Sequence, residues 1–308
     1  MKKLFSVVFL IFSISSFCSS VTNIALTGSF ADISYAALFN NPSYSFESFP
    51  SPNDAVRSFS QGETDAIILS VPAALRLTSL SSGEVELLAV TQEQDLYCVT
   101  SVATCKDITD LLGKKVCISK GGLQEPFVTY VFEKCDLPLV IGRGGVTPSW
   151  ENNSSLSVGK LIDGSLSYAV LSEPFVSTLT KHPKFHIAVD FKKEFESIAG
   201  KKEIVPKCIL VCRKSYIKEN PEGYSSFLSD MEKSAAFIEK NPVLASNLCV
   251  KYSNVNKSAA LSKSVKNAKF TFVPYREAEK GLSSLVEIYN KKSKDKLLLP
   301  SVSNSLPK

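Results

Sequence analysis

Two segments of the chain place a serine and a proline at the end of an apolar run, and one of them adds a carboxylate. Residues 69–72 read LSVP and residues 171–174 read LSEP, each after a glycine-led apolar run. Serine hydroxyls and free backbone N–H groups at such positions can bind a small polar ligand, and Glu173 can bind a cationic one. The same residues also make good helix starts, with Ser70 and Ser172 as N-caps and the prolines in the first turn, so both interpretations stay open.

Signatures of catalysis and of metal binding are missing from the sequence. No G-x-S-x-G nucleophile elbow occurs, and His182 and His186 are badly placed for a catalytic triad. The GRGG run at residues 142–145 lacks the G-K-[ST] ending of a phosphate loop, and no C-x-x-C pair is present. The sequence therefore predicts a protein that is not an enzyme and that uses no metal or cofactor.

Length and charge limit the classes of protein that fit. A chain of 308 residues with 44% hydrophobic and 21% charged residues is globular and long enough for two domains. Its formal charge of +5 falls by two when Lys2 and Lys3 are removed with an N-terminal leader, and the lysines are scattered. This mild balance argues against a nucleic-acid partner.

The first twenty residues have the pattern of a signal peptide. MKK is a positive start, LFSVVFLIFSISSF is an apolar segment too short for a comfortable membrane span, and CSS supplies small residues. Lipid anchoring through Cys18 competes with cleavage after Ser20, because Phe17 stands where a lipoprotein signal carries a small residue. We expect the mature protein in the periplasm or on the extracytoplasmic face of the cell membrane.

Seven cysteines follow Cys18, an odd number that cannot pair completely within the chain. Cys208 and Cys212 lie four apart in an expected strand, which places them on one face but roughly 13 Å apart, beyond disulfide reach. We interpret most of these cysteines as small buried hydrophobic residues.

Strand and helix patterns alternate along the chain and begin again about halfway. AIILSVP (66–72) has the near-continuous apolar character of a parallel strand that is buried on both faces. One long strand is expected at 85–101, and another at LPLVIGRGG (137–145). After NPEG (220–223) the chain is expected to be mostly helical.

This alternation predicts an α/β protein of two lobes. The first lobe takes residues 21–100 and 205–308, the second takes residues 101–204, and the chain crosses between them near Cys98 and Val205. Ligands of such sheets bind beyond the carboxyl ends of the strands, so the site is expected between the lobes.

Four segments, taken in order, resemble a known family. They are AVRSFSQGETDAIILSVPAAL (55–75), GKKVCISKGGLQEPFVTYVFEKCDL (113–137), GSLSYAVLSEPFVSTL (164–179) and ILVCRKSYIKENPEGYSSFL (209–228). Together they resemble the extracytoplasmic substrate-binding proteins of ABC importers, in the nitrate/taurine/thiamine-precursor class with the type II periplasmic-binding fold. Ser167 departs from the acidic residue usual in that family, and VTPSW departs from its usual turn.

The resemblance implies a monomeric clamshell that closes on a small-molecule solute through two crossover hinge strands and passes it to a membrane permease. The strand-end loops supply the candidate ligand-binding residues. They are Thr27, Gly28, Ser29, Ser51, Ser70, Gly121, Gly122, Gln124, Glu125, Trp150, Ser172 and Glu173.

The candidate residues include two carboxylates, Glu125 and Glu173, and no lysine or arginine. A neutral or cationic nitrogen-containing solute, stacked on Trp150, is therefore expected rather than nitrate or a sulfonate. Ordinary packing of Trp150, a solvated helix start for Glu125 and a bond within its own helix start for Glu173 are the competing interpretations.

Two other functions stay open. Some enzymes of cofactor biosynthesis use the same two-lobed fold, although an export signal argues against cytoplasmic substrates. A surface lipoprotein that keeps the fold but binds host or envelope partners is the third alternative.

Overall fold

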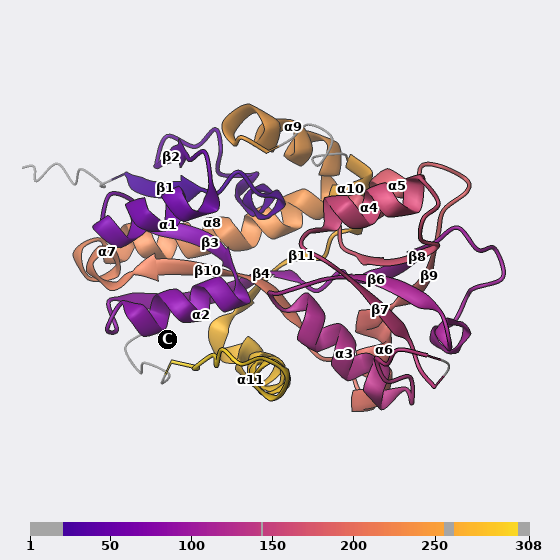
Figure 1. Ribbon diagram of the computed structural model, residues 1–308. Helices are drawn as coiled ribbons and strands as arrows, with labels where there is room; N and C mark the ends of the chain where they lie inside the picture. Colours follow the sequence, from indigo (N-terminus) through magenta and orange to yellow (C-terminus); the bar gives the residue numbers. More distant parts are fainter. Residues whose placement is uncertain (1–20, 143, 256–261, 301–308) are drawn as a thin grey trace, which may run out of the picture.

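The computed structural model describes residues 21–142, 144–255 and 262–300, so the expected leader and Cys18 lie outside the described residues. The chain forms two lobes, each built on one β-sheet, and Figure 1 shows one on the left and one on the right. Mixed strands and helices alternate through both lobes, which confirms the predicted α/β architecture.

The sheet of the first lobe has the order β11-β4-β10-β3-β1-β2. β1 pairs in parallel with both β2 and β3, whereas β10 is antiparallel to β3 and β4, and β11 is antiparallel to β4. The strands are β1 (Thr22–Leu26), β2 (Tyr44–Ser48), β3 (Ala66–Ser70), β4 (Val85–Glu93), β10 (Pro206–Arg213) and β11 (Phe270–Pro274).

The sheet of the second lobe has the order β7-β6-β8-β5-β9. β6 pairs in parallel with β7 and β8, and β5 is antiparallel to β8 and β9. The strands are β5 (Tyr97–Thr100), β6 (Lys115–Ser119), β7 (Thr147–Glu151), β8 (Tyr168–Leu171) and β9 (His186–Asp190).

Helices cover both faces of the first sheet. One face packs against α1 (Pro52–Gln61), α2 (Val71–Leu80) and α11 (Tyr275–Lys292) through side chains such as Phe59, Leu75 and Leu285. The other packs against the 3-10 helix η1 and the helices after β10, with Tyr35, Phe227 and Cys249 in its core. These elements are η1 (Phe30–Tyr35), α7 (Lys214–Glu219), α8 (Pro221–Lys240), α9 (Pro242–Tyr252) and α10 (Ser262–Asn267).

The second sheet is covered in the same way. Phe127, Phe132 and Phe191 join the core on the side of α3 and α6, whereas Leu161 and Val176 form a separate core on the side of α4 and α5. The helices are α3 (Gln124–Lys134), α4 (Ser154–Ile162), α5 (Phe175–Leu179), α6 (Phe191–Ala199) and the 3-10 helix η2 (Ile108–Leu111).

The helix α1 shows how local sequence sets an element. Ser51 begins it by accepting the Asp54 N–H, Pro52 fits the first turn, and Gly62 ends it at a φ of +83°, which favours glycine. The buried face carries Ala55 and Phe59. These are the start and stop signals expected from the sequence.

The chain passes between the sheets twice, once between β4 and β5 and once between α6 and β10. The long strand expected at 85–101 is therefore two strands in different sheets, and the first crossover falls at residues 94–96, before the position near Cys98. At the second crossover α11 approaches so closely that a Cβ on Gly281 would lie 2.0 Å from the Ile204 carbonyl oxygen.

The strand prediction at LPLVIGRGG (137–145) was wrong. Its described residues, 137–142 and 144–145, form no strand, and an isolated bridge joins Leu139 to Val146, because Pro138 lacks a donor and the glycines favour loop conformations. The segment VTPSW, where no strand was predicted, contributes to the edge strand β7, where Pro148 is tolerated. The edge strand β11 was not predicted.

The seven cysteines of the described chain are free thiols, and six of them are buried. This confirms their interpretation as small hydrophobic residues. No helix in the described residues is both long and apolar enough to span a membrane.

Candidate functional site

The candidate residues of the first lobe follow three parallel strands whose carboxyl ends share one edge of the sheet. Thr27, Gly28 and Ser29 follow β1, Ser51 follows β2, and Ser70 ends β3. The structure therefore brings these five residues to one edge, as the strand pattern predicts.

Thr27 is held inside the lobe rather than presented to solvent. It is 4% exposed, and both its N–H (3.2 Å) and its Oγ1 (3.0 Å) donate to Asp32 Oδ1. Ser253 Oγ donates to the other oxygen of Asp32 at 2.6 Å. Burial raises the pKa of Asp32, although these hydrogen bonds oppose the increase. Thr27 thus belongs to a buried network that fixes the end of β1.

Gly28 is half-exposed beside this network, at a φ of +69°. A Cβ at this position would lie 3.7 Å from the Asn254 side chain and 3.7 Å from the Phe49 carbonyl oxygen. Asn254 is exposed, and its N–H donates to Ser48 Oγ at 3.2 Å. Sequence reasoning missed Asn254, because no local pattern connects it to strand ends about two hundred residues earlier.

Ser51 and Ser70 have different environments. Ser51 Oγ donates to Asp54 Oδ2 at 2.7 Å and accepts the Asp54 N–H, so this hydroxyl is used within α1. Ser70 is exposed before α2, and its side chain makes no capping bond to that helix. Of the two, only Ser70 presents a hydroxyl that a ligand can use.

In the second lobe, two glycines lead from β6 into α3. Gly121 and Gly122 are exposed and have φ values of +79° and +58°, which favour glycine. Glu125 accepts the Gly121 N–H at 3.0 Å, and Gln124 Nε2 donates to the Val170 carbonyl at 2.8 Å. Gln124 therefore ties α3 to β8, and Glu125 stabilises the glycine turn.

Trp150 lines a hollow of about 410 Å³ beside α3. Gly121, Gly122 and Glu125 line this hollow, so it gathers four of the predicted residues. The end of α11 supplies Tyr289 and Lys292, and Lys294 follows the helix; the sequence suggested none of these three residues. Lys292 is ion-paired with Glu133 of α3.

Ser172 and Glu173 differ from their predicted roles at a helix start. The N-cap of α5 is Pro174, so Ser172 is not the cap and Pro174 does not lie in the first turn. The Glu173–Pro174 peptide bond is cis, unlike the corner at Ser70. The two corners are thus alike in sequence but not in backbone conformation.

Glu173 is 3% exposed, and its carboxylate accepts two hydrogen bonds from Ser177 of α5, the helix that it precedes. The Ser177 N–H lies 3.0 Å from Oε2, and Ser177 Oγ lies 2.7 Å from Oε1. Burial raises the pKa of Glu173, and the Ser177 bonds oppose it. The structure thus gives Glu173 the bond within its own helix start that competed with ligand binding.

Chemically, the site offers hydroxyl groups, backbone N–H groups and one tryptophan face. Within the three described ranges, no group of three histidine, cysteine or carboxylate side chains could hold a metal ion. These groups can hold a small polar molecule by hydrogen bonds and stacking.

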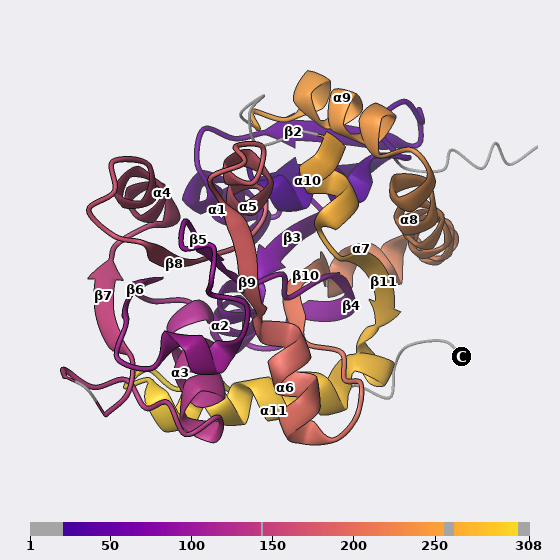
Figure 2. The ribbon, with the colours of Figure 1, turned by 90° about the vertical axis from the view of Figure 1, so that its right-hand side faces the viewer.

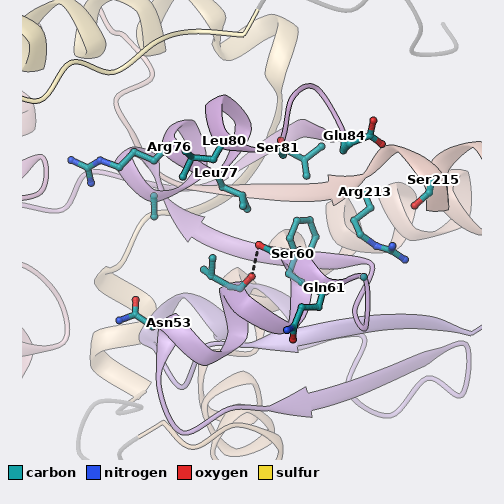
Figure 3. Close-up of a pocket in the computed structure, with 15 residues that line it drawn as sticks. Asn53, Ser60, Gln61, Arg76, Leu77, Leu80, Ser81, Glu84, Arg213 and Ser215 are labelled. Carbon is teal, nitrogen blue, oxygen red and sulfur yellow. Dashed lines mark hydrogen bonds between the residues drawn. The ribbon is translucent and has the colours of Figure 1, made fainter.

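A larger hollow of about 700 Å³ lies between α1 and α2, away from these residues. Figure 3 shows Leu77 of α2 and Ser60 of α1 on opposite sides of it. Arg213 lies at one end, where its guanidinium pairs with Asp65 at 2.9 Å. None of the predicted site residues lines this groove.

No protein-family model and no curated protein sequence matches this chain. Solved structures do match. An ABC transporter structure from Parabacteroides distasonis is 16% identical, with a TM-score of 0.70 and coverage of 89% of this chain and 93% of that one. The periplasmic aliphatic sulphonate binding protein SsuA from Escherichia coli is 11% identical, with a TM-score of 0.65 and coverage of 90% and 95%.

A ligand-binding component of an ABC-type import system from Staphylococcus aureus is 13% identical, with a TM-score of 0.59 and coverage of 88% and 91%. At these identities the similarity concerns the fold alone. The chain has the two-lobed α/β fold seen in these binding proteins.

Proposed function

We propose that this protein captures a small solute between its lobes, outside the cytoplasm, and delivers it to the membrane permease of an ABC importer. The observation that carries the proposal is the pair of parallel strand edges, β1-β2-β3 and β6-β7-β8, on a chain that crosses twice between the lobes. Two crossovers form a hinge, and a solute that touches both lobes would shift the hinge equilibrium toward closure.

The fold of the solved relatives supports this role, and the expected leader supports an extracytoplasmic location. The absence of a nucleophile elbow in the sequence supports solute binding over turnover. We propose that the protein works as a monomer that meets the permease only transiently.

The side chains beside Trp150 favour a nitrogen-containing solute of no net charge. Glu125, Lys292 and Lys294 line the same hollow, and Lys292 is ion-paired with Glu133. One acidic group and one basic group, Glu125 and Lys294, therefore stay near the tryptophan face. Glu173 does not add a preference for a cationic solute, because its carboxylate accepts hydrogen bonds from Ser177. Amino acids and pyrimidines belong to this class, whereas nitrate and sulfonates do not.

A thermal-shift screen tests the proposal. We expect amino acids or pyrimidines to raise the melting temperature by mass action, and amines, sulfonates and nitrate to leave it unchanged. Trp150 is the single tryptophan, so each hit should also change the intrinsic fluorescence, and scattering should show a more compact molecule.

Trp150→Ala should weaken the response to a hit, and Trp150→Phe, which keeps an aromatic face, should weaken it less. A hit that is chemically converted would favour the enzyme alternative instead. No response across all five solute classes would contradict the proposal and favour a surface interaction role.

A further inference from the structure

The two lobes touch away from the hinge, through α5 of the second lobe and α10 of the first. Figures 1 and 2 show these two helices side by side from both directions. A second contact joins α3 to the end of α11 on the opposite side of the molecule. The helix α5 directly follows the Ser172–Pro174 corner, so the α5–α10 contact lies next to the candidate site.

A chain of side-chain hydrogen bonds crosses this contact. Asn267 Nδ2 of α10 donates to Ser177 Oγ of α5 at 3.0 Å, and Ser177 Oγ donates to Glu173 Oε1 at 2.7 Å. Ser177 has one hydroxyl proton, so it can donate to Glu173 only if its other hydrogen-bond partner is a donor. The amide of Asn267 supplies that donor, and Asn267 and Ser177 are 90 residues apart.

A second polar bond lies in the same contact. Lys263 Nζ of α10 donates to Thr180 Oγ1 at 3.2 Å, next to the end of α5. Both Asn267 and Lys263 are exposed on α10, so neither is needed to fill a core. In these two bonds the partners, Ser177 and Thr180, belong to the second lobe.

We propose that Asn267, Ser177 and Glu173 form an interlobe latch that holds this angle between the lobes when no solute is bound. The inference rests on the proposed clamshell function. The latch biases the lobe angle on this side of the molecule, because the Asn267–Ser177 bond can form only while α5 lies against α10. The latch would reduce the conformational entropy that the protein loses when a solute binds.

The test measures the lobe angle in the absence of any solute. Probes introduced as genetically encoded amino acids at exposed Thr104 and Glu239 report the distance between the lobes, and scattering reports the radius of gyration. Asn267→Ala should shift the ratio of separated to latched molecules by about twofold to tenfold, the effect of one lost hydrogen bond. Asn267→Asp should shift it at least as far, because the aspartate has the same size but no donor for Ser177.

Asn241→Asp is the matched control, since the Asn241 side-chain amide donates to the Phe237 carbonyl of the same lobe, at 3.2 Å. It should leave the distance distribution unchanged. The latch is overturned if either Asn267 variant keeps the wild-type distribution, or if the control shifts it equally. Failure of the solute screen leaves these measurements intact, so the latch and the proposed function fail separately.

Discussion

Lys207 Nζ lies 2.6 Å from Asp95 Oδ1, and this ion pair joins the first crossover to the start of β10, directly after the second crossover. Asp95 is fully buried, whereas the Lys207 side chain is 22% exposed. Gln92 Nε2 donates to the other carboxylate oxygen at 3.4 Å. The two segments that form the hinge are thus held together by one asymmetric, mostly buried pair.

This asymmetry predicts unequal effects of removing either partner. Lys207→Met leaves the Asp95 carboxylate buried with one weak amide contact, so the free energy of unfolding should fall by about 3 kcal/mol. Asp95→Asn leaves a lysine that can reach water, so the loss should be about 1 kcal/mol. Urea denaturation measures both, and equal losses would contradict the assignment of the burial cost to Asp95.

Gly281 allows α11 to pass against the second crossover. Gly281→Ala should lower the melting temperature, because its Cβ would collide with the Ile204 backbone, which cannot move like a side chain. Gly159→Ala in α4 is the control, since nothing lies within 4 Å of its added Cβ. There the gain in helix propensity should stabilise the protein by about 0.5–1 kcal/mol. Similar shifts in both variants would refute the proposed collision.

Alanine substitutions of Ser70 and Ser51 should separate an effect on ligand binding from an effect on stability. Ser51→Ala should cost about 1 kcal/mol of unfolding free energy, because the N-cap of α1 is lost, and it should leave solute affinity unchanged. Ser70→Ala should leave stability unchanged and weaken binding of the solute found in the screen by about fivefold or more. Calorimetric titration and thermal melting of the two variants check this; reversed effects would remove Ser70 from the site.

Ionisation of Glu173 should lower the free energy of unfolding as pH rises. Its pKa is raised in the folded protein, with burial as the largest cause, from an ordinary value of 4.5. The folded state therefore holds this proton more tightly than the unfolded state, and stability from this group is lost as pH increases above 4.5 toward the folded pKa. Glu173→Gln should flatten the pH dependence of the unfolding free energy in that range. An unchanged slope in the variant would show that Glu173 does not titrate there.

Much of the first lobe could be predicted, because short-range signals decide its elements. Ser51, Pro52 and Gly62 mark the two ends of α1, and the apolar run of β3 indicates a strand buried on both faces. These features depend on residues a few positions apart. The repeated strand-to-helix pattern then limits the connections to a parallel α/β arrangement.

Edge strands could not be predicted in this way. β7 contains Pro148 and follows a glycine-rich loop, so its own sequence indicates a turn, and its pairing with β6 makes it a strand. Likewise, β11 is a strand because β4 offers it a free edge. Such pairing depends on segments far apart in the chain.

Some features of the candidate site could likewise be predicted from the sequence, and others depend on the tertiary structure. The sequence alone identified the strand ends that carry Ser70 and Gly121, because loop positions follow from the order of strands and helices, whereas Trp150 lies within the unpredicted strand β7. Only the tertiary structure decided which groups are free: the Ser70 hydroxyl is exposed, while the Glu173 carboxylate is buried against Ser177. Asn267 reaches Ser177 from the other lobe, because packing of the two lobes, rather than any local pattern, sets that contact.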